Sequence, residues 1–168
     1  QRKGNWRSRE QVLFINICIV GVLACVALDL WQRVLLVMFK IPPSNWAVVG
    51  RWLISFLRTM IWVQSEVAQR DAIKNELLIG WSFHYLIAIF YASVYAALFN
   101  FGIIGFNFID GLIFGIISVI VPWFFFMPAM GAGIMASNTP NPRLACTLAF
   151  ATHGVFGISL GLLFQIFS

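Results

Sequence analysis

Four ionisable side chains lie inside long apolar stretches of the sequence: Asp29, Arg33, His84 and His153. A charge in hydrocarbon is costly, so such residues are rare unless they bind a ligand, relay a proton or pair with each other. Histidine gains and loses protons near neutral pH, so the two histidines are candidates to relay protons or bind a small solute. Asp29 and Arg33 are four residues apart and can pair on one helix face. The alternative for each residue alone is a hydrogen bond to a neighbouring helix, or a side chain that reaches the membrane surface.

The composition places these residues in a membrane protein. Of the 168 residues, 61% are hydrophobic and 10% are charged, whereas an ordinary soluble domain carries about 25% charged residues. The net charge is +5, but the basic residues cluster at the ends of apolar runs. This pattern indicates contacts with lipid headgroups and excludes a nucleic-acid partner. The three cysteines form no C-x-x-C pair, so neither a disulfide framework nor a zinc knuckle is predicted.

Four apolar runs are long enough to cross a hydrocarbon core, which needs about 20 residues. They cover residues 12–39, 77–99, 108–127 and 145–167. The first run is too long for the apolar part of a secretory signal peptide, so we expect it to remain as a span. The sequence predicts an all-α integral membrane protein, a four-transmembrane-helix bundle that forms one domain over residues 1–168.

A fifth segment, residues 47–63, has an amphipathic pattern. Arg51 and Arg58 share one helical face, whereas Leu53 and Phe56 share the other. Two arginines are costly in hydrocarbon, and three tryptophans in this region favour the membrane surface. We therefore predict an interfacial amphipathic helix, with a fifth crossing as the alternative.

The four ionisable residues share a similar predicted depth. Counted at 1.5 Å per residue from the side that carries the first and third connections, His84 lies about 10 Å deep and His153 about 12 Å deep. On the same scale Arg33 lies at about 9 Å and Asp29 at about 15 Å. Small residues, which mark helix contacts in membranes, share their helical faces: Gly21, Cys25, Gly80, Ala88, Ala149, Gly157 and Gly161. We expect a polar pocket inside the bundle. Asp110 begins the third run at the opposite side, as a helix-start carboxylate.

The stretch PAMGAGIMASNTPNPR, residues 128–143, follows the third apolar run. No Lys-Ser or Lys-Thr pair follows its glycines, so a phosphate-binding loop is disfavoured. Proline breaks helices, and glycine permits unusual backbone angles. We expect residues 128–134 to form a broken helix end or a short re-entrant turn over the pocket, with an ordinary interfacial loop as the alternative. The candidate residues of this lid are Pro128, Gly131, Gly133, Asn138 and Arg143.

Five sequence motifs run in order from the first apolar segment to the last: LDLW, VGRW, GWSFHY, the proline- and glycine-containing stretch above, and THGVFG. With these motifs the chain resembles a family of small bacterial integral-membrane proteins known only as a domain of unknown function. The resemblance implies a four-helix protein of the bacterial inner membrane and supplies no activity. The chain departs from the family pattern in the unusually apolar stretch around Ile54–Val63.

Three classes of function fit the sequence. The first is a small oligomeric transporter of protons or a solute, in which His84 and His153 bind or relay and Asp29 with Arg33 supplies a counter-charge pair. The second is a non-catalytic accessory or assembly subunit of a larger membrane complex. The third is a metal or haem protein with the two histidines as ligands, although this ligand set is incomplete for zinc. No catalytic residue is predicted, because no nucleophile–base pair is present, and the cofactor is left open. The expected partners are the lipid bilayer, further copies of the chain, or the subunits of a membrane complex.

Overall fold

The computed structural model describes the backbone of residues 2–167 and the side chains of residues 13–167. Within this part of the chain every regular element is helical, which confirms the all-α fold class. The elements in order are α1 (Arg2–Phe39), α2 (Trp46–Thr59), α3 (Glu76–Asn100), α4 (Phe108–Ser118), the π-helix η1 (Pro122–Phe126), α5 (Met127–Ala129), the 3-10 helix η2 (Ile134–Ala136) and α6 (Pro142–Phe167).

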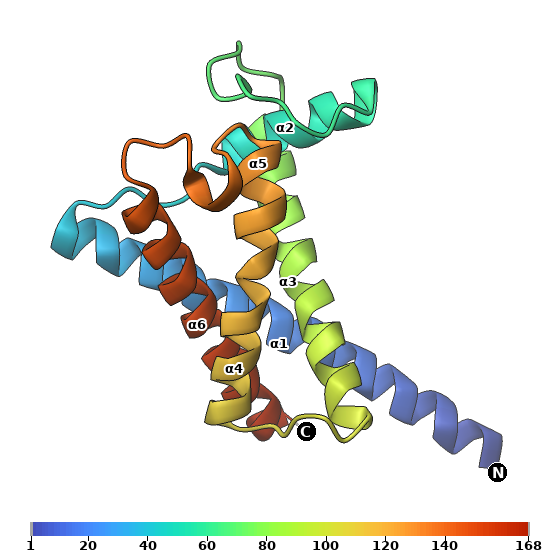
Figure 1. Ribbon diagram of the computed structural model, residues 1–168. Coiled ribbons are helices and arrows are strands. Elements are labelled where there is room, and N and C mark those ends of the chain that lie inside the picture. The colour runs from blue at the N-terminus through green and yellow to red at the C-terminus, as the bar shows by residue number, and fades with distance from the viewer. Residues whose placement is uncertain (1, 168) are drawn as a thin grey trace.

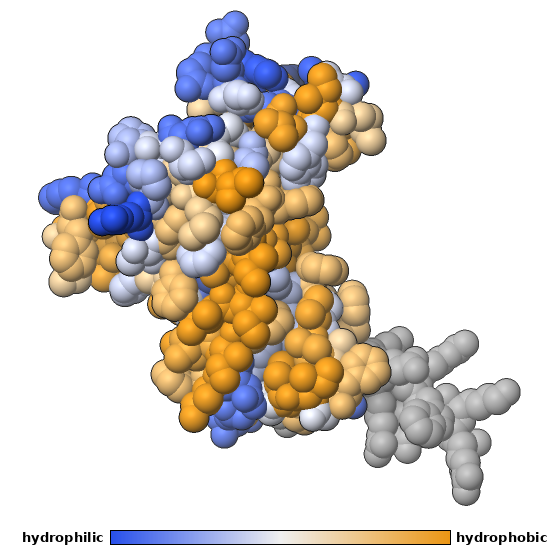
Figure 2. Space-filling view, in the orientation of Figure 1, coloured by the Kyte–Doolittle hydropathy of each residue, from blue (hydrophilic) through white to orange (hydrophobic). Residues whose placement is uncertain are grey.

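Four helical stretches among the described residues are long and apolar enough to cross a membrane: Leu13–Phe39, Glu76–Asn100, Phe108–Ala129 and Pro142–Phe167. The shortest has 22 residues, which corresponds to about 33 Å at 1.5 Å per residue and exceeds the hydrocarbon thickness of about 30 Å. Figure 2 shows apolar residues over the middle of the molecule and hydrophilic residues gathered at its two ends. The chain is an integral membrane protein.

The helices pack around α1 and α6. Helix α1 crosses obliquely behind the other long helices (Figure 1) and contacts both α3 and α6. Helix α4 packs along α6, and α2 packs against α3. The end of α6 and the start of α1 both lie at the end of the bundle opposite α2 (Figure 1), as an even number of crossings requires. The apolar core lies between α1, α3 and α6, and its largest members are Leu28, Tyr95, Phe156, Leu160 and Phe164.

Glycines bring α4 and α6 into direct backbone contact. A Cβ atom at Gly111 would collide with the carbonyl oxygen of Gly157, and one at Gly157 would collide with that of Gly111. Gly115 faces the backbone of His153 in the same way. Because small residues let helix backbones approach in a membrane, this row fixes the pairing of the two helices. That pairing in turn sets the position of His153.

Helix α2 lies across the end of α3 (Figure 1). Its first turn is capped by the Asn45 side chain, which accepts hydrogen bonds from the backbone nitrogens of Ala47 and Val48 at 3.1 and 3.4 Å. The helix ends at Thr59 because Met60 adopts a left-handed conformation with φ of 56°, four residues before the predicted end. Its 14 residues measure about 21 Å, too short to cross a bilayer.

The polar face of α2 differs from the sequence-based expectation at Arg51, which is buried rather than turned to the surface. Its guanidinium donates two hydrogen bonds of 2.8 Å to the carboxylate of Glu76. The remaining guanidinium nitrogen, Nη1, donates hydrogen bonds to the carbonyl oxygens of Val67, Ala68 and Arg70. The hydrogen bond to Glu76 raises the pKa of the Arg51 guanidinium above its ordinary value, so the side chain stays charged. Arg51 thus fixes the connection between α2 and α3.

Candidate functional site

The bundle contains a partly open cavity of about 760 Å³ at the end where α2 lies. Side chains of α1, α3, α6 and the turn formed by η1 and α5 line it, together with the connection between α1 and α2. The walls are mostly apolar. The polar lining residues include Gln32, Ser44, Asn45, His84, Thr152 and His153. A volume of this size with a few polar groups on apolar walls is typical of small-molecule sites, which measure about 300–1,000 Å³.

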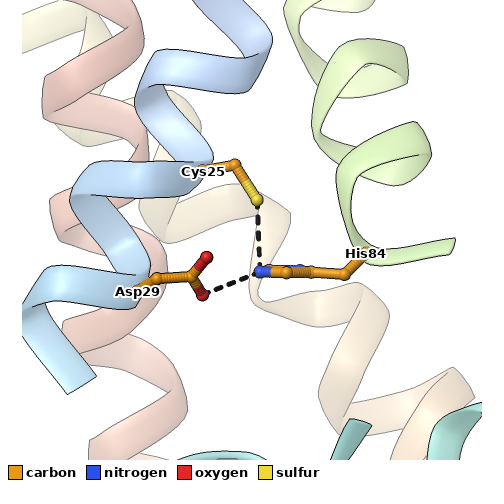
Figure 3. A group of neighbouring side chains, drawn as sticks. All are labelled: Cys25, Asp29 and His84. Carbon is orange, nitrogen blue, oxygen red and sulfur yellow. Dashed lines mark hydrogen bonds and ion pairs between the residues drawn. The ribbon is translucent and has the colours of Figure 1, made fainter. Parts of the chain in front are cut away.

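His84 of α3 faces two polar side chains of α1 (Figure 3). Its Nε2 atom lies 3.0 Å from Oδ1 of Asp29 and 3.1 Å from Sγ of Cys25. Cys25 and Asp29 are four residues apart, so one turn of α1 presents both to α3. The hydroxyl of Tyr85 donates a hydrogen bond of 3.0 Å to the other carboxylate oxygen of Asp29. Two adjacent residues of α3 therefore hold one carboxylate of α1.

One face of the His84 ring is covered by the first residue of α2. The indole of Trp46 stacks on the imidazole with ring centroids 3.8 Å apart and an angle of 21° between the planes. Trp81 lies at 5.7 Å from the same ring. The imidazole is thus held between a carboxylate and aromatic rings.

His153 of α6 reaches the same cavity from another wall. Its Nδ1 atom lies 2.7 Å from the hydroxyl oxygen of Ser118, and this hydroxyl also lies 2.7 Å from the carbonyl oxygen of Gly115. A hydroxyl has one proton to donate. If that proton goes to the carbonyl oxygen, Nδ1 of His153 carries the ring proton and donates it to Ser118. In a neutral ring Nε2 is then an acceptor, and among the described residues it has no hydrogen-bond partner.

The structure brings together some of the residues selected from the sequence and separates others. Asp29 and His84 are in contact, and His153 shares the cavity with His84. Arg33 is exposed and, within the described part of the chain, forms no ion pair with Asp29. Asp110 lies in the first turn of α4 and accepts hydrogen bonds from the turn before that helix. Because His84 Nε2 already faces Asp29, the two histidines are not arranged as a free axial pair for haem.

Cys25 was not selected as a site residue from the sequence. Its side chain is fully buried, it contacts His84 and it lines the cavity. The sequence feature that could have identified Cys25 is its spacing of four residues from Asp29, which places both side chains on one helical face.

The start of the predicted lid, at Pro128, continues the third helical stretch, Phe108–Ala129. Proline has no N–H to donate and disrupts the regular helical ladder. From Pro122 the chain adopts a π-helical turn to Phe126, and then α5 continues to Ala129, so that Pro128 lies within a helix. Side chains of Met127, Met130, Ala132 and Thr139 from this region line the cavity. A π-helical turn of this kind is frequent at functional sites.

None of the five residues selected for the lid is among the residues that line this cavity, although sequence neighbours of four of them are. Gly131 and Gly133 have φ angles of +85° and +79°, which side chains rarely adopt. The side-chain amide of Asn138 donates a hydrogen bond of 3.2 Å to the carbonyl oxygen of Gly131. Pro128 belongs to α5, and Arg143 is exposed in the first turn of α6. Gly131, Gly133 and Asn138 thus shape the turn, and Met130, Ala132 and Thr139 beside them line the cavity.

Long apolar helices around an internal cavity define this chain as a polytopic integral membrane protein. Residues 18–166 match the model of the family described as "Protein of unknown function (DUF2938)", and the chain belongs to that family. This match confirms the resemblance inferred from the five motifs. Neither a curated protein nor a solved structure matches the chain.

Proposed function

We propose that this protein carries a small solute, together with protons, across the bacterial inner membrane. The observation that supports the proposal is that His84 and His153, from two different helices, line one cavity inside the bundle. An ionisable group in a membrane span marks a substrate or proton path by default. Apolar walls with few polar groups fit a small solute that is mainly apolar and carries one hydrogen-bonding group.

We assign the binding of the transported proton to the pair formed by His84 and Asp29. Their 3.0 Å separation allows the imidazole to donate to the carboxylate, and a protonated imidazole forms an ion pair there. Tyr85 keeps the carboxylate oriented through its own hydrogen bond. His153 supplies a second imidazole, whose Nε2 is available to a solute in the cavity. Protonation of either ring changes the charge of the cavity and hence its affinity for the solute.

The proposal includes assembly of several copies. One bundle of four helices is small for a complete transport path, and all four long helices expose apolar side chains. Those surfaces suit both lipid and a second copy of the chain.

A proton-flux assay in liposomes tests this proposal. Purified protein is reconstituted with a pH-sensitive dye inside the vesicles, and a proton gradient is applied. We expect wild-type flux above that of empty vesicles, and loss of most of it in His84→Ala and in His153→Ala. Ser159→Ala is the matched control, because this hydroxyl bonds the carbonyl oxygen of Val155 in its own helix. Flux that is unchanged in both histidine variants, at equal incorporation, would refute the proposal.

An accessory subunit is the second candidate. An apolar group lies outside the four long helical stretches, at the end of α2 and after it: Leu57, Met60, Ile61 and Val63 are all more than half exposed. This surface suits a partner subunit as well as the membrane surface. Co-purification of one partner at fixed stoichiometry, lost on Leu57→Glu but kept in both histidine variants, would favour this role.

A further inference from the structure

We infer that Cys25, Asp29 and His84 form a binding site for a divalent transition-metal ion of the zinc class in the wall of the cavity. This inference does not depend on the proposed transport, because metal binding is measured on protein at equilibrium without any flux.

The geometry carries the inference. The thiol, carboxylate and imidazole atoms that would bind the ion all lie within 4.8 Å of one another, and all three side chains point to a common centre (Figure 3). Bonds of about 2.0–2.3 Å to nitrogen, oxygen and sulfur are usual for zinc. The Nε2 atom of His84 is 3.0 Å from Asp29 and 3.1 Å from Cys25, so small rotations of these side chains suffice to admit an ion.

The charge of the site selects a divalent ion. Zinc binds cysteine as the thiolate, so binding forms the metal–sulfur bond, breaks the S–H bond of Cys25 and releases one proton to water. The thiolate and the carboxylate of Asp29 together carry two negative charges, and neutral His84 adds none. A divalent ion therefore makes the cluster neutral, which avoids the high cost of an unpaired charge in a low-dielectric interior.

The ligand types select the metal class. Magnesium and calcium prefer oxygen ligands, whereas a set of one sulfur, one nitrogen and one oxygen suits zinc and its neighbours in the first transition series. Three protein ligands leave the fourth position of a tetrahedral ion for a water molecule or a solute. Cys25 and His84 both line the cavity, so that open position faces the space where a solute would bind.

Groups around the three ligands are placed to hold them. The hydroxyl of Tyr85 donates to the Asp29 oxygen that does not face His84, as partners of metal-binding carboxylates commonly do. Trp46 stacks on the His84 ring and limits its rotation. Cys25 is fully buried, so its sulfur is shielded from bulk water.

Cobalt serves as the probe, because a cobalt–thiolate bond gives a charge-transfer absorption band that carboxylate and imidazole ligands do not. Chelator-treated protein in lipid nanodiscs is titrated with Co²⁺ and then with Zn²⁺, and bound metal is counted by elemental analysis. We expect one ion per chain, a thiolate band that zinc displaces, and one proton released per ion. Cys25→Ser should abolish the band. Cys18→Ser and Cys146→Ser are matched controls and should retain it, since neither cysteine belongs to the cluster.

Near-isosteric variants separate metal binding from folding. Asp29→Asn keeps the side-chain shape and His84→Gln keeps a polar side chain of similar length, and each should weaken Co²⁺ binding at least tenfold while the protein elutes as a single species. Tyr85→Phe should weaken binding by about 10- to 100-fold, the usual effect of removing a partner of a ligand. The inference is overturned if wild-type protein binds no stoichiometric metal. It is equally overturned if Cys25→Ser keeps the thiolate band, or if folded Asp29→Asn and His84→Gln bind like the wild type.

Discussion

Trp46, the first residue of α2, lies flat against the imidazole of His84 in α3. Helix α2, which belongs to none of the four candidate membrane spans, is thereby joined to the most polar part of the bundle. The contact places α2 over the group formed by Cys25, Asp29 and His84. Any motion of α2 away from α3 would uncover this group from the α2 side.

Removal of the Trp46 ring should expose Cys25. In a background of Cys18→Ser and Cys146→Ser, we expect Trp46→Ala to increase the rate of Cys25 labelling by a small maleimide at least tenfold. The physical reason is that the indole covers the His84 ring next to a thiol that is fully buried. Trp46→Phe keeps an aromatic ring and should label at nearly the wild-type rate. Equal labelling of the alanine variant and the wild type would show that the indole does not close this side.

The pair formed by Arg51 and Glu76 should be required for the stability of the α2–α3 unit. Removal of one partner leaves the other charge buried and unpaired, which is strongly unfavourable. We expect Arg51→Met and Glu76→Gln each to lower the midpoint of thermal unfolding in detergent. The two changes should combine less than additively, because they disrupt one interaction.

Arg58→Met is the matched control for that pair, since Arg58 lies in the same helix and is exposed. Its unfolding midpoint should remain close to the wild-type value. A fall as large as that of Arg51→Met would mean that positive charge on α2, and not the pairing, stabilises the protein.

The helical class and the family were predictable because both depend on local sequence. A run of about 20 apolar residues indicates a span whatever its neighbours, and the fixed rise of a helix brought His84 and Asp29 to similar predicted depths. The burial of each turn of a helix was not predictable. Arg33 follows Asp29 by four residues, as Asp29 follows Cys25, yet Arg33 is exposed. The spacing predicts a shared face, but it does not show at which turn of α1 the neighbouring helices cease to cover that face.

The burial of Arg51 was also beyond the sequence pattern. An amphipathic repeat shows that one face is polar, but it does not show whether water or folded-back chain covers that face. Here the connection after α2 supplies carbonyl oxygens of Val67, Ala68 and Arg70 to the guanidinium. Such pairing depends on contacts between residues far apart in the chain, which periodicity does not encode.

The glycine row between α4 and α6 should tolerate no side chain at Gly157. An added methyl group there collides with the backbone of Gly111 and Gly115, and we expect a loss of about 1–3 kcal/mol in the free energy of unfolding, as for other overpacked cores. Gly154→Ala is the control in the same helix, because its methyl group would meet only Leu112 at an ordinary distance of 3.6 Å. Reversible unfolding in mixed micelles measures both. Equal stability of the two variants would contradict the close contact between these helices.

The turn after α5 should depend on Gly131 for two separate reasons. Gly131 and Gly102 both have positive φ angles, +85° and +70°, and an alanine in the left-handed region costs about 1–2 kcal/mol. Only at Gly131 would the methyl group also collide with backbone, that of Ser65; at Gly102 the space is open. We therefore expect Gly131→Ala to be the more destabilising change and to increase protease cleavage in residues 61–75. Similar cleavage of both variants would show that backbone conformation alone matters.

The length of α1 makes the site sensitive to the thickness of the bilayer. Its apolar stretch has 27 residues, about 40 Å at 1.5 Å per residue, against about 30 Å of hydrocarbon. A helix with such excess length adapts by tilting, and α1 already runs obliquely (Figure 1). Shorter acyl chains demand a steeper tilt, which moves Cys25 and Asp29 past His84, whereas longer chains relax it. We expect the cobalt affinity of the site to change with acyl-chain length. Metal binding by this cluster would then depend on the composition of the membrane.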